Sequence, residues 1–217
     1  MRCDIQLYNQ DCMPAMAKMK DNQFDLAIVD PPYGIGADKK NSGKELKSKK
    51  SSALSKDYGS QRWDGNIPTD KYFNELKRVA KNQIIWGANY YGLKGGMIYW
   101  HKEVTMPTYS DGEIAYCSLL NSIKFFKFAW HGMIQGNMKE KEHRIHPTQK
   151  PVQLYKWLLQ NYAKEGDKIL DTHLGSGSIA LACWDLCFDL TGYEIDKEYY
   201  TNAMARLERH KTQGQLF

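Results

Sequence analysis

The 217-residue sequence has no long apolar run, no CxxC cysteine pair and no Gly-Lys-Ser/Thr phosphate loop. A membrane-spanning helix needs about 20 apolar residues, so none is expected, and the N-terminal residues show no signal-peptide pattern. His143 and His146 have no second ligand pair, so we expect no metal. Cys183 and Cys187 share one face of a predicted helix, where we expect two small buried residues in a reduced, intracellular protein.

The most informative segment follows the apolar run of residues 24–29, which predicts a buried strand. It ends in Asp30, Pro31, Pro32 and Tyr33. The two prolines stiffen the turn and leave its carbonyl groups free to accept hydrogen bonds. A carboxylate and a carbonyl can accept both protons of a planar NH₂ group while an aromatic ring stacks on its heterocycle. The segment is thus a candidate site for a nucleobase amine, and an ordinary strand-to-loop turn is the simpler alternative.

A second pattern lies near the C-terminus. A short strand is predicted over residues 167–171, a glycine-rich turn over 172–178 and a helix over 178–187. Glycine lets the backbone approach a ligand closely. The next predicted strand, 189–193, ends at Glu194, whose carboxylate can accept hydrogen bonds from two ribose hydroxyls. No lysine follows the glycines as a triphosphate loop requires, which argues against a nucleoside triphosphate as the ligand.

A third segment, HPTQKP at residues 146–151, precedes a predicted helix over 151–164 with apolar residues at helical spacing. Pro151 suits the first turn of such a helix. Taken alone, the segment predicts only a capped amphipathic helix with Lys150 as a solvated charge. Its place between the other two patterns favours a role at the same site.

Together the three segments resemble the motifs of the β class of DNA amino-methyltransferases, which methylate adenine N6 or cytosine N4. DPPY resembles their catalytic tetrapeptide and the glycine-rich turn resembles their S-adenosylmethionine loop, which here comes last, as in that class. HPTQKP resembles the element that helps to hold the methionine end of the cofactor. The match extends from about Ile5 to Leu207. The loop departs from the usual DPFxGSGT at Thr172, His173 and Ser178.

This resemblance implies S-adenosylmethionine as cofactor, and Asp30, Pro31, Pro32 and Tyr33 as the catalytic motif. Asp11 is then expected beside the cofactor adenine, although it could also simply cap the following helix. The cofactor-binding residues implied by the match are Asp11, Cys12, Asp30, Thr148, Lys150, Asp171, His173, Gly175, Ser176, Gly177, Ser178, Glu194 and Ile195.

The net charge of +5 is modest, but between Asp38 and Arg62 eight Lys/Arg residues accompany only three acids and six serines. A charge run is usually a solvated surface. In the resembled family this segment borders the opening of the base pocket, where lysines can neutralise DNA phosphates. Residues 86–90 (WGANY), at another strand end, are the best candidates to line that pocket. The predicted DNA-contacting residues are Lys39, Lys40, Lys47, Lys49, Lys50 and Arg62.

The expected fold is one Rossmann-like α/β domain over residues 1–217, with a mainly parallel sheet of seven to eight strands and helices on both faces. Two strands within 113–130, joined by a short loop, are candidates for its antiparallel edge, and DNA-contacting insertions are expected near 35–68 and 102–145. Strands are predicted near 4–8, 24–30, 82–87, 96–100, 113–117, 123–130, 167–171 and 189–193. Helices are predicted near 13–20, 69–80, 151–164, 178–187 and 197–210.

The function that the resemblance implies is methyl transfer to adenine N6 of a flipped-out DNA base, because DPPY is more typical of adenine enzymes. Cytosine N4 is the alternative; RNA bases and protein glutamine are more distant ones, and a DNA-binding protein without catalysis is a third class. Double-stranded DNA is the expected partner, a homodimer is compatible with the sequence, and no membrane partner is expected. The expected compartment is the cytoplasm of a bacterium or phage-infected cell. The recognition sequence and the biological setting, restriction-modification or other, are not encoded in any motif.

Overall fold

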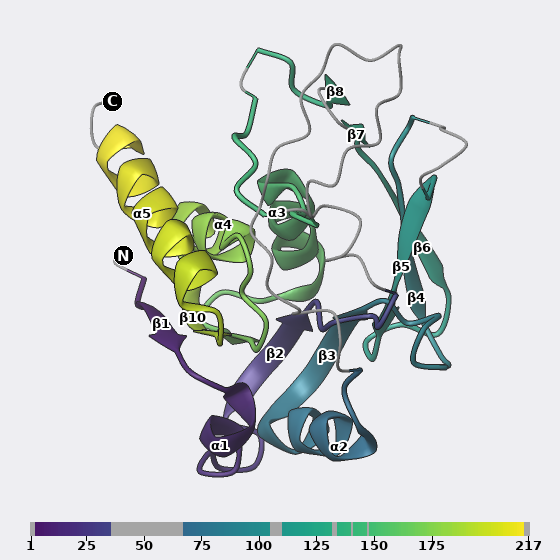
Figure 1. Cartoon of the computed structure of the whole chain (residues 1–217). Helices are drawn as coiled ribbons and strands as arrows, with labels where there is room; N and C mark the ends of the chain where they lie inside the picture. The colour runs from purple at the N-terminus through teal and green to yellow at the C-terminus, as the bar shows by residue number, and fades with distance from the viewer. Residues whose placement is uncertain are drawn as a thin grey trace.

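One eight-stranded sheet organises the part of the chain that the computed structural model describes, residues 3–35, 67–104, 110–131, 134–139, 141–146 and 148–214. Its strands are β1 (Ile5–Asn9), β2 (Phe24–Val29), β3 (Ala80–Trp86), β4 (Met97–His101), β5 (Gly112–Cys117), β6 (Ile123–Lys127), β9 (Lys168–Asp171) and β10 (Asp189–Glu194). They lie in the order β1-β10-β9-β2-β3-β5-β4-β6 (Figure 1). The first five are parallel, which confirms the predicted mainly parallel α/β sheet.

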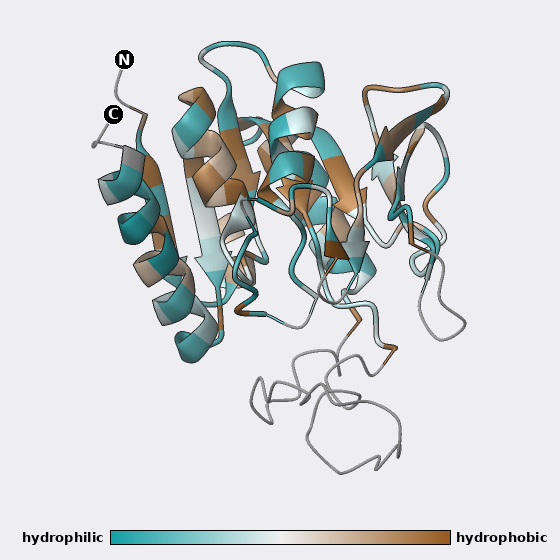
Figure 2. Ribbon diagram, turned by 90° about the horizontal axis from the view of Figure 1, so that it is seen from above, coloured by the Kyte–Doolittle hydropathy of each residue, from teal (hydrophilic) through white to brown (hydrophobic). Residues whose placement is uncertain are grey.

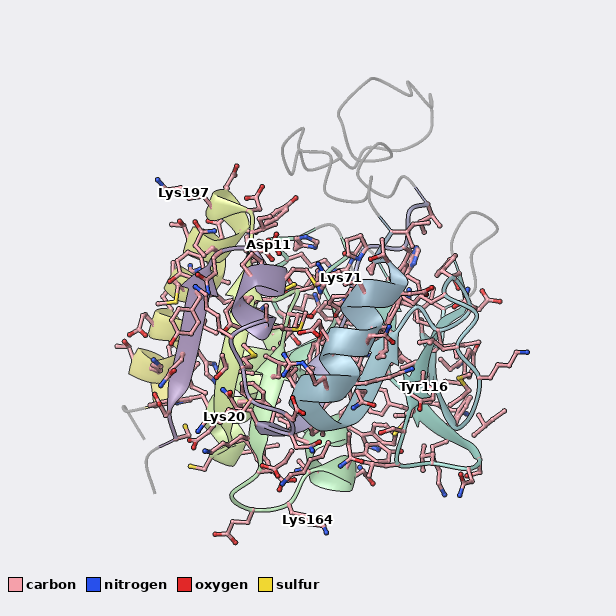
Figure 3. The ribbon with its side chains drawn as sticks, turned by 90° about the horizontal axis from the view of Figure 1, so that it is seen from below. Asp11, Lys20, Lys71, Tyr116, Lys164 and Lys197 are labelled. Carbon is pink, nitrogen blue, oxygen red and sulfur yellow. The ribbon has the colours of Figure 1, made fainter. Side chains whose placement is uncertain are left out.

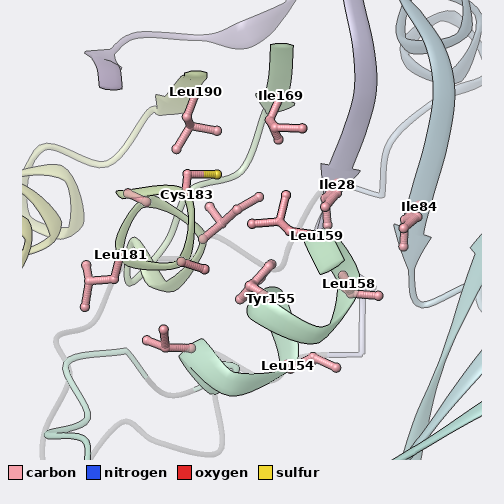
Figure 4. Packing of buried hydrophobic residues seen from close by; sticks show 14 of the residues in the cluster. Ile28, Ile84, Leu154, Tyr155, Leu158, Leu159, Ile169, Leu181, Cys183 and Leu190 are labelled. Atoms are coloured by element: carbon pink, nitrogen blue, oxygen red, sulfur yellow. The ribbon is translucent and has the colours of Figure 1, made fainter. Parts of the chain in front are cut away.

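Within the described ranges, five helices cover the two faces of this sheet and make three layers. They are α1 (Cys12–Met16), α2 (Asp70–Val79), α3 (Val152–Tyr162), α4 (Ser178–Leu186) and α5 (Lys197–Gly214). Because side chains alternate along a strand, Ala27 and Val29 of β2 pack with α1 and α2, whereas Ile28 packs with α3 and α4. Figure 4 shows Ile28 beside Leu159 in that second cluster. Figure 2 shows apolar residues concentrated in the strands and a largely hydrophilic α5.

The connections change direction between the neighbouring strands β9 and β2. From β2 the chain continues through α2 to β3 on one side, and from β9 it continues through α4 to β10 on the other. In open α/β sheets this topological switch point, at the carboxyl ends of the strands, is where ligands bind. Figure 3 shows Asp11 and Lys71 toward the carboxyl ends of the parallel strands and Lys164 at the opposite end of the sheet.

The antiparallel part of the sheet differs from the predicted pair within 113–130. β5 is antiparallel to both β3 and β4, but β6 pairs in parallel with β4, so β4 separates the two strands. Gly96 makes this possible, because a Cβ there would lie 2.1 Å from the Leu120 carbonyl oxygen. The loop from β5 to β6 can therefore pass directly over the start of β4, where Met97 N–H donates to the Ser122 carbonyl at 3.1 Å.

Several helix ends also differ from the prediction. α5 continues to Gly214 rather than ending near residue 210. α1 ends at Met16 rather than near residue 20, and the Arg78 guanidinium donates to the carbonyls of Met16 (2.7 Å) and Met19 (2.8 Å) at this end. α4 ends at Leu186, and Cys187 caps it with φ +57°. Cys187 is therefore exposed, which makes the prediction of two buried cysteines wrong for this residue, while Cys183 is buried.

Outside the main sheet, the described residues include a two-stranded hairpin of β7 (Trp130–His131) and β8 (Ile134–Gln135). No helix in the described ranges has the length and apolar character to cross a membrane.

Candidate active site

Four carboxylates lie at the carboxyl ends of four adjacent parallel strands. Asp11 follows β1, Glu194 ends β10, Asp171 ends β9 and Asp30 follows β2. Strand pairing places Asn9, the last residue of β1, opposite Glu194. The DPPY segment and the glycine-rich loop therefore meet at the topological switch point, as their positions after apolar strands predict.

The DPPY turn is held by hydroxyl groups. Tyr33 donates its hydroxyl to Asp30 Oδ1 at 2.5 Å. The Tyr91 hydroxyl lies 2.8 Å from both the Pro31 and the Pro32 carbonyl oxygens. Each carbonyl oxygen has two lone pairs, so Pro31 can still accept a second hydrogen bond. The Tyr33 ring stacks on Tyr90 with 4.9 Å between ring centroids.

Lys150 of the HPTQKP segment reaches this turn from the other half of the chain. Its side chain is 3% exposed, and its ammonium forms an ion pair with Asp30. It also lies 3.0 Å from Glu113 Oε2 and donates to the Tyr33 hydroxyl at 3.1 Å. Glu113 pairs in turn with Lys102 at 2.7 Å. The two lysines and two carboxylates therefore alternate and balance in charge.

These contacts shift the acidities of the network. Burial raises the pKa of the Asp30 carboxyl above its usual range, against the opposing effect of Lys150. Burial also acts to raise the pKa of Glu113, but Lys150 and Lys102 outweigh it and lower this pKa to about 2. Burial acts to lower the pKa of Lys150, but Asp30 and Glu113 raise it above its ordinary value. Lys150 is therefore charged at pH 7.

Sequence reasoning did not find Glu113 or Lys102. The available signal was the alternation of β5, in which Glu113 shares the inward register with the buried Ala115 and Cys117. An acid in the inward register of a strand requires a partner. Three protein oxygens already surround the Lys150 ammonium. Its expected role as a direct cofactor ligand stays a prediction.

The glycine-rich loop has the backbone conformation that its glycines predict. Gly175 has φ +51° and Gly177 has φ +70°. The Gly175 N–H donates to Glu194 Oε2 at 2.8 Å, and the Asp196 N–H donates to Oε1 at 2.9 Å. Glu194 is thus fixed by backbone groups, with further lone pairs left to accept ligand hydroxyls.

Arg206 on α5 ties this loop to the HPTQKP side of the site. Its guanidinium donates to the Ser176 carbonyl and to Ser178 Oγ, both at 2.9 Å, and pairs with Glu142 at 2.6 Å. The other oxygen of Glu142 accepts the Val152 N–H at the start of α3, at 2.8 Å. Nothing in the sequence around Arg206 distinguishes it from the neighbouring surface charges of α5.

Thr172 and His173, where the loop departs from the usual family pattern, are accommodated by Tyr72 of α2. Thr172 Oγ1 lies 2.6 Å from the Tyr72 hydroxyl and 2.9 Å from His173 Nδ1. The His173 ring meets Tyr72 edge-on, with 5.4 Å between centroids. Burial lowers the pKa of His173 to about 4, so this cluster is neutral at pH 7.

The other predicted site residues have varied surroundings. Asp11 is exposed and caps α1 through the Met13 N–H at 2.8 Å, as the simpler interpretation predicts. Burial raises the pKa of the Cys12 thiol to about 12, which makes it a poor nucleophile. Thr148 is exposed, and Ile195 is 69% exposed.

The predicted DNA contacts lie outside the described residues; they are Lys39, Lys40, Lys47, Lys49, Lys50 and Arg62.

Comparison with known proteins identifies the family. The sequence profile of the DNA methylase family, covering N6 and N4 methyltransferases, matches residues 97–205. Type II methyltransferase M.HpaI of Haemophilus parainfluenzae is 25% identical over 94% of this chain and 74% of its own length. For M2.DpnII of Streptococcus pneumoniae the identity is 26%, over 93% of this chain and 89% of its own length.

Two solved structures have a similar fold. An M1.HpyAVI–SAM complex aligns with a TM-score of 0.59 and 21% identity, over 94% of this chain and all (100%) of that one. The PvuII cytosine-N4-specific DNA methyltransferase aligns with a TM-score of 0.60 and 12% identity, over 98% of this chain and 92% of that one. The fold and the strand-end site define a Rossmann-like methyltransferase. The chain belongs to the DNA methylase family and is an S-adenosylmethionine-dependent DNA amino-methyltransferase.

The residues at the strand ends fit this cofactor. S-adenosylmethionine carries a cationic sulfur, amino groups and two ribose hydroxyls, which match an edge lined by the four carboxylates. A Cβ at Gly175 would meet nothing closer than 3.9 Å, so the loop leaves room beside the backbone. Burial raises the pKa of Asp171 to about 8, and a cationic ligand nearby would favour its charged form.

Proposed function

We propose that this protein methylates adenine N6 in double-stranded DNA, with Asp30, Pro31 and Tyr33 as the residues that hold the target base. The observation that carries this proposal is the grouping of a carboxylate (Asp30), a carbonyl (Pro31) and a ring (Tyr33) at the switch point, beside the glycine-rich loop. The Asp30 side chain remains 19% exposed, and its Oδ1 has a lone pair beyond the one that accepts from Tyr33.

The base must leave the duplex stack to reach this turn, which costs a few kcal/mol that pocket contacts offset. Asp30 and the Pro31 carbonyl would accept hydrogen bonds from the two protons of the amino group, which favours a pyramidal nitrogen with an available lone pair. When bound, S-adenosylmethionine supplies a methyl group already activated by its positive sulfur. The amine nitrogen would form the new bond to the methyl carbon as the methyl–sulfur bond breaks and its electron pair returns to sulfur, which leaves a neutral thioether. The nitrogen would then release one proton, for which Asp30 is the proposed acceptor. In-line placement of the amine and the methyl group would supply much of the rate enhancement.

Adenine is favoured over cytosine by the residue before the prolines. Asp30 occupies a position that is more often serine in the cytosine-N4 enzymes of the resembled class. Both bases present an amine on a ring, so Asp30, Pro31 and Tyr33 can hold either one, and the identity of the methylated nucleoside distinguishes them. Cys12 is buried with a raised pKa, so the covalent cysteine route of carbon-5 methylation is not supported.

The deciding experiment incubates the protein with methyl-labelled S-adenosylmethionine and unmethylated duplex DNA and identifies the product nucleosides by mass. We expect N6-methyladenine from the wild type and none from Asp30→Ala. The matched Asp30→Asn variant keeps one acceptor oxygen and is expected to retain part of the activity. Cofactor binding, measured by calorimetry, should change by no more than a few-fold in either variant. N4-methylcytosine would overturn the base assignment, and label on RNA or protein instead of DNA would overturn the substrate.

A further inference from the structure

Tyr90 covers the ring on which the target base is proposed to stack. Its ring lies 4.9 Å from that of Tyr33 with only 20° between their planes. Tyr91, by contrast, meets Tyr33 edge-on, at 71°. A Cβ at Gly87 would lie 2.4 Å from Tyr33 Cε1, so backbone packs directly against the ring there. Among the described residues, Tyr90 is thus the one aromatic that occupies a stacking position on Tyr33.

Several features give Tyr90 room to move. It is 46% exposed, although it stacks on a residue of the catalytic turn. It lies in a turn with glycines of positive φ on each side, Gly87 (+76°) and Gly92 (+64°). A cavity of about 480 Å³ adjoins it, lined by Ile67, Phe73 and Leu93 among others, and Tyr33 is not among the lining residues. The Tyr90 ring can therefore retreat from Tyr33 into an adjoining space.

We infer that Tyr90 is a second base-binding residue, which moves back to admit the flipped base and stacks on the face opposite Tyr33. This inference rests on the proposed function, because it assumes that the base stacks on Tyr33. A planar base between two rings requires about 7 Å between them, twice a carbon contact distance of about 3.5 Å. The two rings are now in direct stacking contact, so they must move apart by about one further contact distance, about 3.5 Å, to admit the base. The ligand that this slot fits is a flat aminated heterocycle, held by stacking on both faces.

The test compares Tyr90→Ala with the matched Tyr90→Phe, which keeps the ring and removes only the hydroxyl. Methyl transfer is measured over a range of concentrations of unmethylated plasmid DNA, which contains many sequence contexts. Loss of one base–aromatic stack is worth about 1–3 kcal/mol, so Tyr90→Ala should lower kcat/KM by about 5- to 150-fold. Tyr90→Phe should remain within about twofold of the wild type. Unchanged melting temperature and cofactor affinity would show that the Ala variant is folded.

A spectroscopic measurement isolates stacking from any structural effect. Once the methylated position is mapped, 2-aminopurine replaces the target base, because its fluorescence is quenched by stacking. Emission from the bound complex should be low for wild type and Tyr90→Phe and clearly higher for Tyr90→Ala. Equal emission and equal kcat/KM in all three would overturn this inference alone. Higher activity in Tyr90→Ala would overturn it too, because Tyr90 would then only block the pocket. A wild type without DNA methylation would remove the proposed function, and the inference with it.

Discussion

Lys150 and Asp30, 120 positions apart in the chain, form a buried ion pair that joins the HPTQKP segment to the DPPY turn. Glu113 Oε2 lies 3.0 Å from the same ammonium, so one buried cation pairs with two partly exposed carboxylates. Removing one partner of a buried pair leaves uncompensated charge, whereas the intact pair contributes little net stability. The pair therefore matters chiefly for holding the Asp30 side chain in one fixed orientation.

The first prediction concerns this cation. Lys150→Met should destabilise the protein by about 3–5 kcal/mol, because Asp30 and Glu113 lose their common partner. Lys156→Met is the matched control, since Lys156 pairs with Asp185 at 2.6 Å but is 30% exposed, and exposed pairs contribute about 0–1 kcal/mol. Urea unfolding of both variants measures the difference. Equally small losses of unfolding free energy in the two variants would show that the charges around Lys150 are well solvated.

A second prediction concerns the link between α5 and the glycine-rich loop. Arg206→Met removes the donors to the Ser176 carbonyl and Ser178 Oγ and leaves Glu142 without its cation. We expect S-adenosylmethionine to bind up to about 30-fold more weakly, because two hydrogen bonds worth roughly 1 kcal/mol each help to hold the loop. Arg209→Met is the control, because Arg209 is exposed on the same helix. Calorimetric titration distinguishes the two, and equal affinities would contradict the role assigned to Arg206.

The sequence predicts those parts of the site that depend on short, local patterns of residues. Apolar runs ending in Asp30, Asp171 and Glu194 predict strands, and parallel strands bring their carboxyl ends to one edge. The alternation of strands and amphipathic helices likewise predicts the three layers. The predictable features therefore depend on residues within one strand, turn or helix.

The parts that were missed depend on contacts between distant segments. Glu113, Arg206 and Tyr72 each reach the site from an element whose placement is set by topology rather than by local spacing. The position of β4 between β5 and β6 likewise depends on the close backbone approach at Gly96. A period-2 pattern predicts a strand but not which strand lies beside it. The sequence therefore does not show that β4 lies between β5 and β6.

A third prediction separates backbone strain from crowding in the loop. Gly177 has φ +70°, and an added Cβ would lie 3.0 Å from Ala203 Cβ, whereas Gly166 has φ +84° with nothing within 4 Å. Gly166→Ala should therefore cost only the left-handed strain, about 1–2 kcal/mol. Gly177→Ala should cost more, and this excess should disappear when the same substitution is made in an Ala203→Gly background and compared with that background, which has its own helix cost of about 0.5–1 kcal/mol. Thermal unfolding of these variants measures the costs, and equal costs at Gly166 and Gly177 would show that the Ala203 side chain shifts without penalty.

The last prediction concerns acid sensitivity. His146 is buried beside Tyr199, with 4.3 Å between ring centroids, and accepts the Thr148 N–H at Nδ1. Burial, aided by the charge of Lys150, lowers its pKa to about 3, whereas an unfolded histidine has a pKa of about 6.5. Between these values the unfolded chain binds more protons than the folded one. Stability from His146 is therefore present above pH 6.5 and is lost as the pH falls toward 3.

His146→Gln keeps a polar side chain but cannot take up this proton. The free energy of unfolding should fall more steeply with acidification in the wild type than in the variant, by at most about 1.4 kcal/mol per pH unit below pH 6.5. Urea unfolding at pH 7, 6 and 5 gives the difference between the two proteins at each pH. Asp171, whose pKa is raised to about 8, acts with the opposite sign in both proteins, so it cancels in this difference. A difference that stays constant with pH would show that His146 is protonated in the folded protein as readily as in the unfolded chain.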